Sequence, residues 1–158
     1  MDLTKPETAD GWESVHGELA INLEAPIHLS MLYLERLRAK PRAAIVNVTS
    51  GLAFAPLAGV PVYCATKAAM HSFTLTLRRQ LAGSSVEVIE IIPPAVDTDL
   101  GGPGLHTFGV ALDEFANAAF EGLRRQENEI AFGFAAQSSR ASRAELDQMF
   151  ERMNAATR

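Results

Sequence analysis

The chain has 158 residues, of which 47% are hydrophobic and 21% are charged, as expected for one soluble globular domain with a packed core. Its net charge of -5 and the lack of any run of Lys or Arg argue against nucleic acid or an anionic membrane as a partner. The single cysteine excludes an internal disulfide, and neither a membrane span nor a signal peptide is recognisable, so a cytoplasmic protein is predicted.

Helical and strand-like patterns alternate in the first half of the chain. Residues 12–40 carry apolar side chains at spacings of three and four, which predicts a long helix that Pro26 interrupts. The β-branched run 43–49 predicts a buried strand. A loop over 52–60 then leads into a second helix, predicted over 61–82 because a proline suits its first turn.

The second half continues the alternation. The predicted elements are a strand over 86–92, a Gly-rich loop at 101–104, a helix over 112–125, a short strand over 129–133 and a last helix over 142–155, which begins with the capping-box residues Ser142 and Glu145. Strands that alternate with helices indicate βαβ units, and hence an α/β fold with a parallel sheet of about three strands flanked by helices.

Tyr63 and Lys67 form the first candidate for chemistry. They lie four residues apart near the start of the helix over 61–82, so their side chains share one face. A phenol has a pKa of about 10, and both a neighbouring ammonium and the positive end of a helix favour its ionised form. The pair therefore has the make-up of a tyrosine acid–base, although an ordinary surface pair on a helix has the same spacing.

Ser50 directly follows the predicted strand over 43–49. Ligands of parallel α/β sheets bind beyond the carboxyl ends of the strands, where a hydroxyl can donate to a substrate oxygen. The surrounding residues Val48-Thr-Ser-Gly51 do not match the G-x-S-x-G turn of hydrolases, so a serine nucleophile is not expected. A plain turn residue before Gly51 is the alternative interpretation.

Asn22 lies four residues before Pro26. A proline inside a helix cannot donate to the carbonyl four residues back, so the main-chain carbonyl of Asn22 is predicted to be free to bind water. If Pro26 instead separates two helices, Asn22 lies close to their boundary.

Four segments, taken in order and spacing, resemble the short-chain dehydrogenase/reductase family. They are Ile21-Asn-Leu23, Ile45-Val-Asn-Val-Thr-Ser50, Tyr63-Cys-Ala-Thr-Lys67 and Pro93-Pro-Ala-Val-Asp-Thr98, and the resemblance covers roughly residues 10 to 135. It implies a Rossmann-like doubly wound parallel sheet and an oxidoreductase that uses NAD or NADP to interconvert a carbonyl and a secondary alcohol. The substrate is then a small molecule.

The resemblance also implies roles for individual residues. Tyr63 would be the general acid–base, Lys67 would lower its pKa and bind the nicotinamide ribose, and Ser50 would orient the substrate oxygen. The main-chain carbonyl of Asn22 would hold a water in a proton relay to the lysine.

The segment after the strand over 86–92 would close over the nicotinamide, which implicates Pro94, Val96 and Thr98 in cofactor binding. The family usually has Pro-Gly where this chain has Pro93-Pro94, so the backbone contact with the cofactor is altered there. The loop from Leu100 to Val110 is expected to set the substrate.

The family's first strand, Gly-rich turn and helix, which hold the cofactor pyrophosphate, have no match in this chain. We therefore expect residues 1–158 to form a single domain that is the C-terminal catalytic half of the fold, without the N-terminal cofactor-binding half. Its strand over 43–49 would be an exposed sheet edge. A start site assigned too late in the gene would explain such a truncation.

Two further hypotheses remain open. A truncated, non-catalytic oligomerisation or binding module of the same fold would show the same residues, and so would a lyase or isomerase of the family. The family's usual packing through the helices over 12–40 and 61–82 implies a homodimer or homotetramer. The histidines lack metal-ligand spacing, so no metal is expected, and only His106, in the presumed substrate loop, is a candidate for testing.

Overall fold

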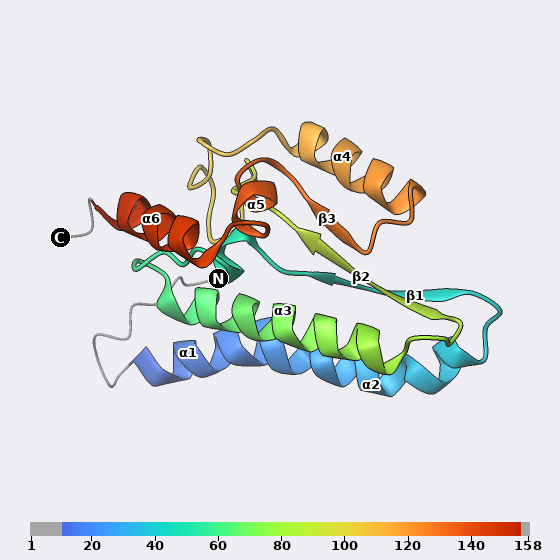
Figure 1. The fold of residues 1–158 in the computed structure, drawn as a ribbon. Helices are drawn as coiled ribbons and strands as arrows, with labels where there is room; N and C mark the ends of the chain where they lie inside the picture. The colour runs from blue at the N-terminus through green and yellow to red at the C-terminus, as the bar shows by residue number, and fades with distance from the viewer. Residues whose placement is uncertain (1–10, 156–158) are drawn as a thin grey trace.

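The computed structural model describes residues 11–155, and its centre is a three-stranded parallel sheet (Figure 1). The strands are β1 (Ala43–Val48), β2 (Val86–Ile92) and β3 (Glu129–Ala131), in the order β1-β2-β3. β1 pairs with β2 from Ala43 opposite Val86 to Val48 opposite Ile91. The predicted α/β class with a partial Rossmann-like parallel sheet is therefore confirmed.

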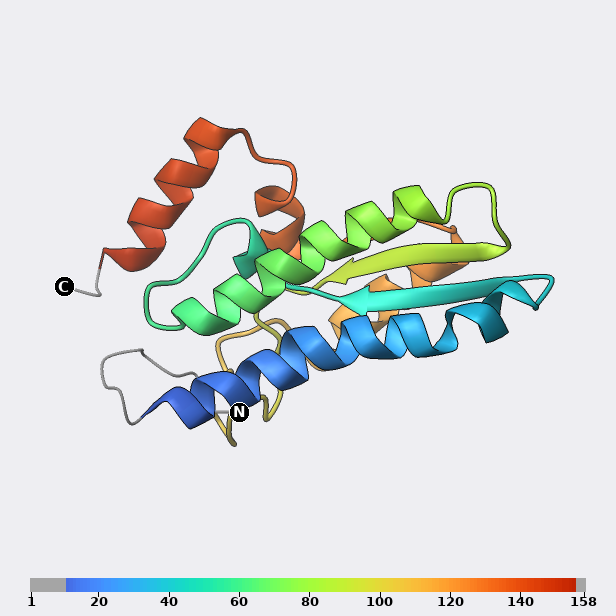
Figure 2. The same cartoon turned by 90° about the horizontal axis from the view of Figure 1, so that it is seen from below.

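One face of the sheet is covered by two long helical segments that lie side by side (Figures 1 and 2). The first consists of α1 (Trp12–Leu19), a π-helical turn η2 (Ala20–Glu24) and α2 (Ala25–Arg38). The second is α3 (Pro61–Gln80), which begins with the predicted proline. These bounds agree with the predicted helices over 12–40 and 61–82 to within a few residues.

Pro26 is accommodated without separating two helices. It stands in the first turn of α2, directly after the π-helical turn η2. Proline cannot donate a hydrogen bond and its ring crowds the carbonyl four residues earlier, so the regular helical ladder cannot pass through this point. The wider π-helical turn accommodates the proline without a regular hydrogen bond at this point. The helical segment therefore continues along one line in Figure 2.

The apolar core lies between this helical layer and the amino ends of the strands. Its buried members are Ile45, Leu77, Leu81, Val86 and Val88. The polar residues described below lie at the other end, beyond the carboxyl ends of the strands.

On the opposite face, α4 (Leu112–Arg124) packs against β3. A β-carbon on Gly122 would come within 2.7 Å of Ile130, so this close approach of helix to strand requires glycine. Val46 and Val48 of β1 point to the same side of the sheet and are 42% and 52% exposed. Within the described residues β1 is a sheet edge, as predicted.

The remaining helices lie near the carboxyl ends of the strands. They are the short 3₁₀ turn η3 (Gly51–Ala53), α5 (Gly133–Ser138) and α6 (Arg143–Asn154). Ser142 and Glu145 form the predicted capping box of α6. Among residues 11–155 no helix combines the length and apolar character that crossing a bilayer requires.

Candidate active site

Ser50 lies at the carboxyl edge of the sheet, where β1 and β2 stay paired beyond their last strand residues. The Thr49 N–H donates to the Ile91 carbonyl at 2.9 Å, and the Gly51 N–H donates to the Pro93 carbonyl at 2.9 Å. Between these two bonds Ser50 is extended and buried, and its hydroxyl accepts a hydrogen bond from the Leu52 N–H at 3.1 Å. The predicted position of Ser50 beyond a strand end is therefore found.

Tyr63 and Lys67 lie in the first turns of α3 and share one face, as their spacing predicts. The Lys67 ammonium lies 5.5 Å from the centroid of the Tyr63 ring. It also donates to the carbonyl of Val48 at 3.0 Å, which ties α3 to the end of β1. The lysine, the tyrosine and the serine are thus brought together at one end of the sheet.

The electrostatic setting of Tyr63 differs from the prediction. Burial raises its pKa above the ordinary value of a phenol, hydrogen bonding with the Ser50 side chain lowers it, and negative charge on Cys64 or Glu18 raises it. Burial also lowers the pKa of Lys67. In the chain by itself the pKa of Tyr63 is therefore raised and not lowered, with burial as the largest cause, and a lowering by the lysine stays a prediction.

Asn22 stands in the π-helical turn η2, which packs against α3. Its side-chain amide nitrogen is buried and has no hydrogen-bond partner among the described residues. With Pro26 four residues later, its main-chain carbonyl lacks the usual helical donor. The prediction that this carbonyl holds a water stays a prediction.

Pro94, Val96 and Thr98 follow β2 in the loop that leaves the sheet at this edge. Val96 forms a single parallel bridge with Val110, whose N–H donates to the carbonyl of Ala95 at 3.0 Å. The Thr98 hydroxyl lies 3.4 Å from the Val96 carbonyl. Backbone hydrogen bonds therefore join the two ends of the following loop. Pro94, Val96 and Thr98 all lie in the segment that enters this loop.

The loop between these bonds is rich in exposed apolar side chains. Leu100, Leu105 and Phe108 are exposed, Phe108 by 77%. His106 packs at 5.9 Å from the Phe108 ring, and its Nδ1 is buried without a hydrogen-bond partner in the described part of the chain. No group of three or more His, Cys, Asp or Glu residues that could hold a metal occurs among residues 11–155.

A buried carboxyl group that the sequence does not predict lies beside this site. Glu18 of α1 is only 5% exposed, and neither of its oxygens has a hydrogen-bond partner within residues 11–155. Burial raises its pKa above 4.5, and its charge influences both Tyr63 and Cys64. The sequence indicates only that Glu18 lies four residues before Asn22 and so on a similar side of the helix. Helical spacing alone does not show whether that side is buried or exposed.

The substitution Glu18→Gln is expected to stabilise the chain at neutral pH, because it removes a charge that burial disfavours. The carboxyl pKa is raised on folding, so the native state binds more protons between pH 4.5 and the folded pKa, and stability falls as pH rises through that window. Urea unfolding at several pH values measures the free energy of unfolding of both proteins. The gain should vanish at and below pH 4.5 and be absent in the exposed control Glu24→Gln; a variant less stable than wild type at neutral pH would contradict the prediction.

The C-terminal helices are attached to the loop that connects Ser50 with Tyr63. The Asn154 side chain of α6 accepts from the Ala58 N–H at 2.6 Å and donates to the Pro56 carbonyl at 3.1 Å. Ser138 of α5 donates to the Gly51 carbonyl at 3.3 Å. The sequence predicts α6 from its capping box but contains no signal for these contacts, which join residues far apart in the chain.

Comparison with known families places these features in context. The model of the short chain dehydrogenase family matches residues 3–106. The chain is 49% identical over 142 residues to the uncharacterized oxidoreductase DltE of Bacillus subtilis, covering 87% of this chain and 56% of that protein. It is also 31% identical over 100 residues to the 2,3-dihydro-2,3-dihydroxybenzoate dehydrogenase of Escherichia coli, covering 63% of this chain and 39% of that protein.

Solved structures have the same fold. A short chain dehydrogenase from Burkholderia cenocepacia in complex with NADP superposes with a TM-score of 0.81 at 25% identity, covering 94% of this chain and 64% of that one. The bulky-bulky ketone specific alcohol dehydrogenase of Comamonas testosteroni superposes with a TM-score of 0.72 at 23% identity, covering 100% of this chain and 60% of that one. This chain thus spans only part of the length of each of these relatives.

Proposed function

Because the chain belongs to the short-chain dehydrogenase family, we propose that it is the catalytic half of an NAD(P)-dependent oxidoreductase that interconverts a carbonyl and a secondary alcohol. The observation that carries this proposal is the convergence of Ser50, Tyr63 and Lys67 at the carboxyl edge of the sheet. The similarity to a B. cenocepacia family member solved with NADP supports the cofactor class.

Tyr63 is the proposed proton donor. A phenol is protonated at neutral pH and would donate to a carbonyl oxygen as that oxygen becomes a hydroxyl. Ser50, whose side chain lowers the pKa of Tyr63, would orient the same oxygen. We propose that a water held at Asn22 passes the replacement proton toward Lys67.

The residues present fit the nicotinamide end of the cofactor. An ammonium has three N–H donors, and in the described part of the chain one donor of Lys67 is used by the Val48 carbonyl, which leaves donors for a ribose hydroxyl. Pro94, Val96 and Thr98 of the adjoining loop would lie against the nicotinamide. The cofactor would supply the hydride to the carbonyl carbon, while the protein supplies the proton and the orientation.

A homodimer or homotetramer is proposed from the outer surface of the long helices. α2 carries Leu29, Met31, Leu32 and Tyr33, all of them exposed, and Leu75 of α3 is 40% exposed. An apolar helix surface of this kind favours burial against another copy of the chain. The same surface supports the second candidate function, a non-catalytic oligomerisation or binding module.

The loop from Leu100 to Val110 is the proposed substrate-binding segment, because its apolar side chains are exposed next to the candidate site. It would favour a small carbonyl or alcohol with an apolar body. We also retain the proposal of a cytoplasmic location from the sequence composition.

A cofactor titration tests whether the chain is one half of the enzyme. Isothermal titration of residues 1–158 with NADH and with NADPH is expected to show no measurable binding, because no Gly-rich turn after a strand is present to hold the pyrophosphate. A chimaera that joins the N-terminal part of the B. subtilis relative to this chain is expected to bind and to oxidise the reduced cofactor with a panel of ketones.

Two lysine variants of the chimaera provide the controls. Lys67→Met should weaken cofactor binding about tenfold or more, because it removes the charged donor, whereas Lys40→Met, in the exposed turn after α2, should leave binding unchanged. A clear binding isotherm from residues 1–158 alone would refute the half-enzyme proposal. A chimaera that binds cofactor but turns over no carbonyl would favour the non-catalytic module.

A further inference from the structure

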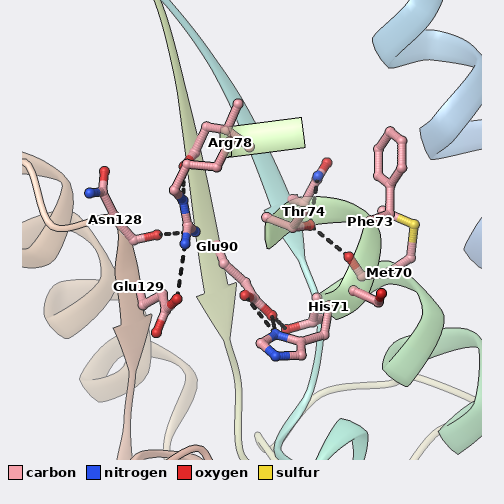
Figure 3. Close-up of polar contacts among 12 residues, drawn as sticks. Met70, His71, Phe73, Thr74, Arg78, Glu90, Asn128 and Glu129 are labelled. Atoms are coloured by element: carbon pink, nitrogen blue, oxygen red, sulfur yellow. Dashed lines mark hydrogen bonds and ion pairs between the residues drawn. The ribbon is translucent and has the colours of Figure 1, made fainter. Parts of the chain in front are cut away.

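A carboxyl group is buried where the sheet would be expected to carry an apolar side chain. Glu90 of β2 faces α3 together with Val86, Val88 and Ile92, and all four are buried, Glu90 completely. Placing a carboxyl group in such an environment costs free energy unless it is well paired. Figure 3 shows Glu90 next to His71 of α3.

Glu90 has two partners that come from different elements. The Thr49 hydroxyl, at the end of β1, donates to Oε1 at 2.6 Å. His71 Nδ1 lies 2.9 Å from Oε2 and 3.0 Å from Oε1. The Thr49–Glu90–His71 brace, as we define these three residues, therefore joins β1, β2 and α3 through buried polar contacts.

The brace lies next to the candidate site along the chain. Three consecutive residues at the end of β1 each interact with a different partner: the Val48 carbonyl binds Lys67 and the Thr49 hydroxyl binds Glu90, while the Ser50 side chain lowers the pKa of Tyr63. The contact of Thr49 with Glu90 involves neither Ser50, Tyr63 nor Lys67. It fixes the position of the residue from which Ser50 extends.

His71 also holds the segment that follows Ser50. Its ring stacks edge-on against Phe54, with the centroids 4.5 Å apart and the planes at 62°. Phe54 directly follows the 3₁₀ turn that begins after Ser50. The serine is thus held on both sides, through Thr49 before it and through Phe54 after it, by contacts that meet at one histidine of α3.

We propose that the Thr49–Glu90–His71 brace is a positioning unit that holds the Ser50 hydroxyl against Tyr63. It acts through Ser50 and contacts neither substrate nor cofactor. The proposal deepens the proposed function, since it concerns the same site, but it is tested on the chain itself without either ligand.

The test uses the ionisation of Tyr63 as its readout. The chain has two tyrosines, so the variant Tyr33→Phe leaves Tyr63 as the only phenol, and ultraviolet difference titration then follows it alone. Because hydrogen bonding with Ser50 lowers the pKa of Tyr63, loss of that contact should raise its titration midpoint. Ser50→Ala, made in the Tyr33→Phe variant, gives the shift of the Tyr63 midpoint that follows from complete loss of the serine hydroxyl.

Thr49→Val keeps the shape of the side chain and removes the hydroxyl of the brace. It is expected to raise the Tyr63 midpoint toward the value in Ser50→Ala, and Thr49→Ser is expected to restore the wild-type midpoint. If Thr49→Val does not fold, as judged by circular dichroism, His71→Phe replaces it, because phenylalanine keeps a ring against Phe54 but lacks Nδ1.

Thr74→Val is the matched control. Thr74 is also a buried threonine between α3 and β1, where its hydroxyl accepts from Asn47 at 2.9 Å and donates to the Met70 carbonyl at 2.7 Å. Both valine variants should lower the melting temperature, whereas only Thr49→Val should move the Tyr63 midpoint. An unchanged midpoint in Thr49→Val, or an equal shift in Thr74→Val, overturns the proposal. Neither the melting temperature nor the Tyr63 midpoint depends on cofactor. The brace can therefore be tested even if the chimaera assay fails.

Discussion

Replacing Tyr63 by phenylalanine in the active chimaera is expected to lower turnover by about a thousandfold or more while cofactor affinity survives. The substitution removes only the phenolic hydroxyl, which is the proposed proton donor, and general acid catalysis by a positioned group contributes up to about ten-thousandfold. The ring that lies under the Lys67 ammonium is retained, and the ammonium remains bound to the Val48 carbonyl. Steady-state kinetics combined with a cofactor titration separates the two effects.

Tyr33→Phe provides the control for this experiment. Tyr33 is 46% exposed on α2, so loss of its hydroxyl should leave turnover unchanged. Turnover of Tyr63→Phe within a few-fold of the parent protein would remove Tyr63 from the mechanism. A parallel loss of cofactor affinity would instead indicate that the phenol mainly supports the binding of the nicotinamide end.

Replacing Gly109 by alanine is expected to destabilise the chain by about 3 kcal/mol or to open the substrate-binding segment. A β-carbon at this position would come within 2.7 Å of the Val96 carbonyl carbon, 2.8 Å of the Asp97 nitrogen and 2.9 Å of the Ala95 carbonyl carbon. These are all backbone atoms, which cannot move aside as a flexible side chain would. The bonds between the Val110 and Ala95–Asp97 backbones would therefore be strained or broken.

Urea unfolding measures the loss in stability, and limited proteolysis detects opening between residues 97 and 110. Gly17→Ala is the control, since a β-carbon on Gly17 of α1 meets nothing within 4 Å, and alanine there should stabilise the helix by up to about 1 kcal/mol. Equal stability of the two variants, with equal rates of cleavage, would show that the close contact at Gly109 is not required.

Most of the secondary structure could be predicted because the sequence carries local signals for it. β2 extends over Val86–Ile92, as predicted for a buried strand that ends before Pro93-Pro94, and α6 follows its capping box. α5 could not be predicted, because its six residues span fewer than two helical turns and leave no periodic pattern to detect.

The candidate site was predictable only where sequence neighbours create it. Tyr63 and Lys67 meet because they are four residues apart on one helix, and Ser50 is placed by the end of a strand. The contact between Thr49 and Glu90 joins residues 41 positions apart, so it depends on the pairing of β1 with β2. No local pattern contains that information.

The same reason explains the error in the predicted direction of the Tyr63 pKa. Proximity of a lysine can be inferred from spacing, but burial depends on what the rest of the chain packs around the ring. In this chain burial is the largest influence on the pKa of the phenol. An ionisable group on a known helix face can therefore be located from sequence without its acidity being known.

The π-helical turn at Ala20–Glu24 has a consequence for the phase of the long helix. Such a turn carries one residue more than a regular one, and each residue of an α-helix advances about 100° around the axis. Deleting a single residue here would restore regular geometry yet swing the preceding turns by that angle, so that Val15 and Glu18 would face water instead of α3. A homologue with one residue fewer there would present different side chains of α1 to α3.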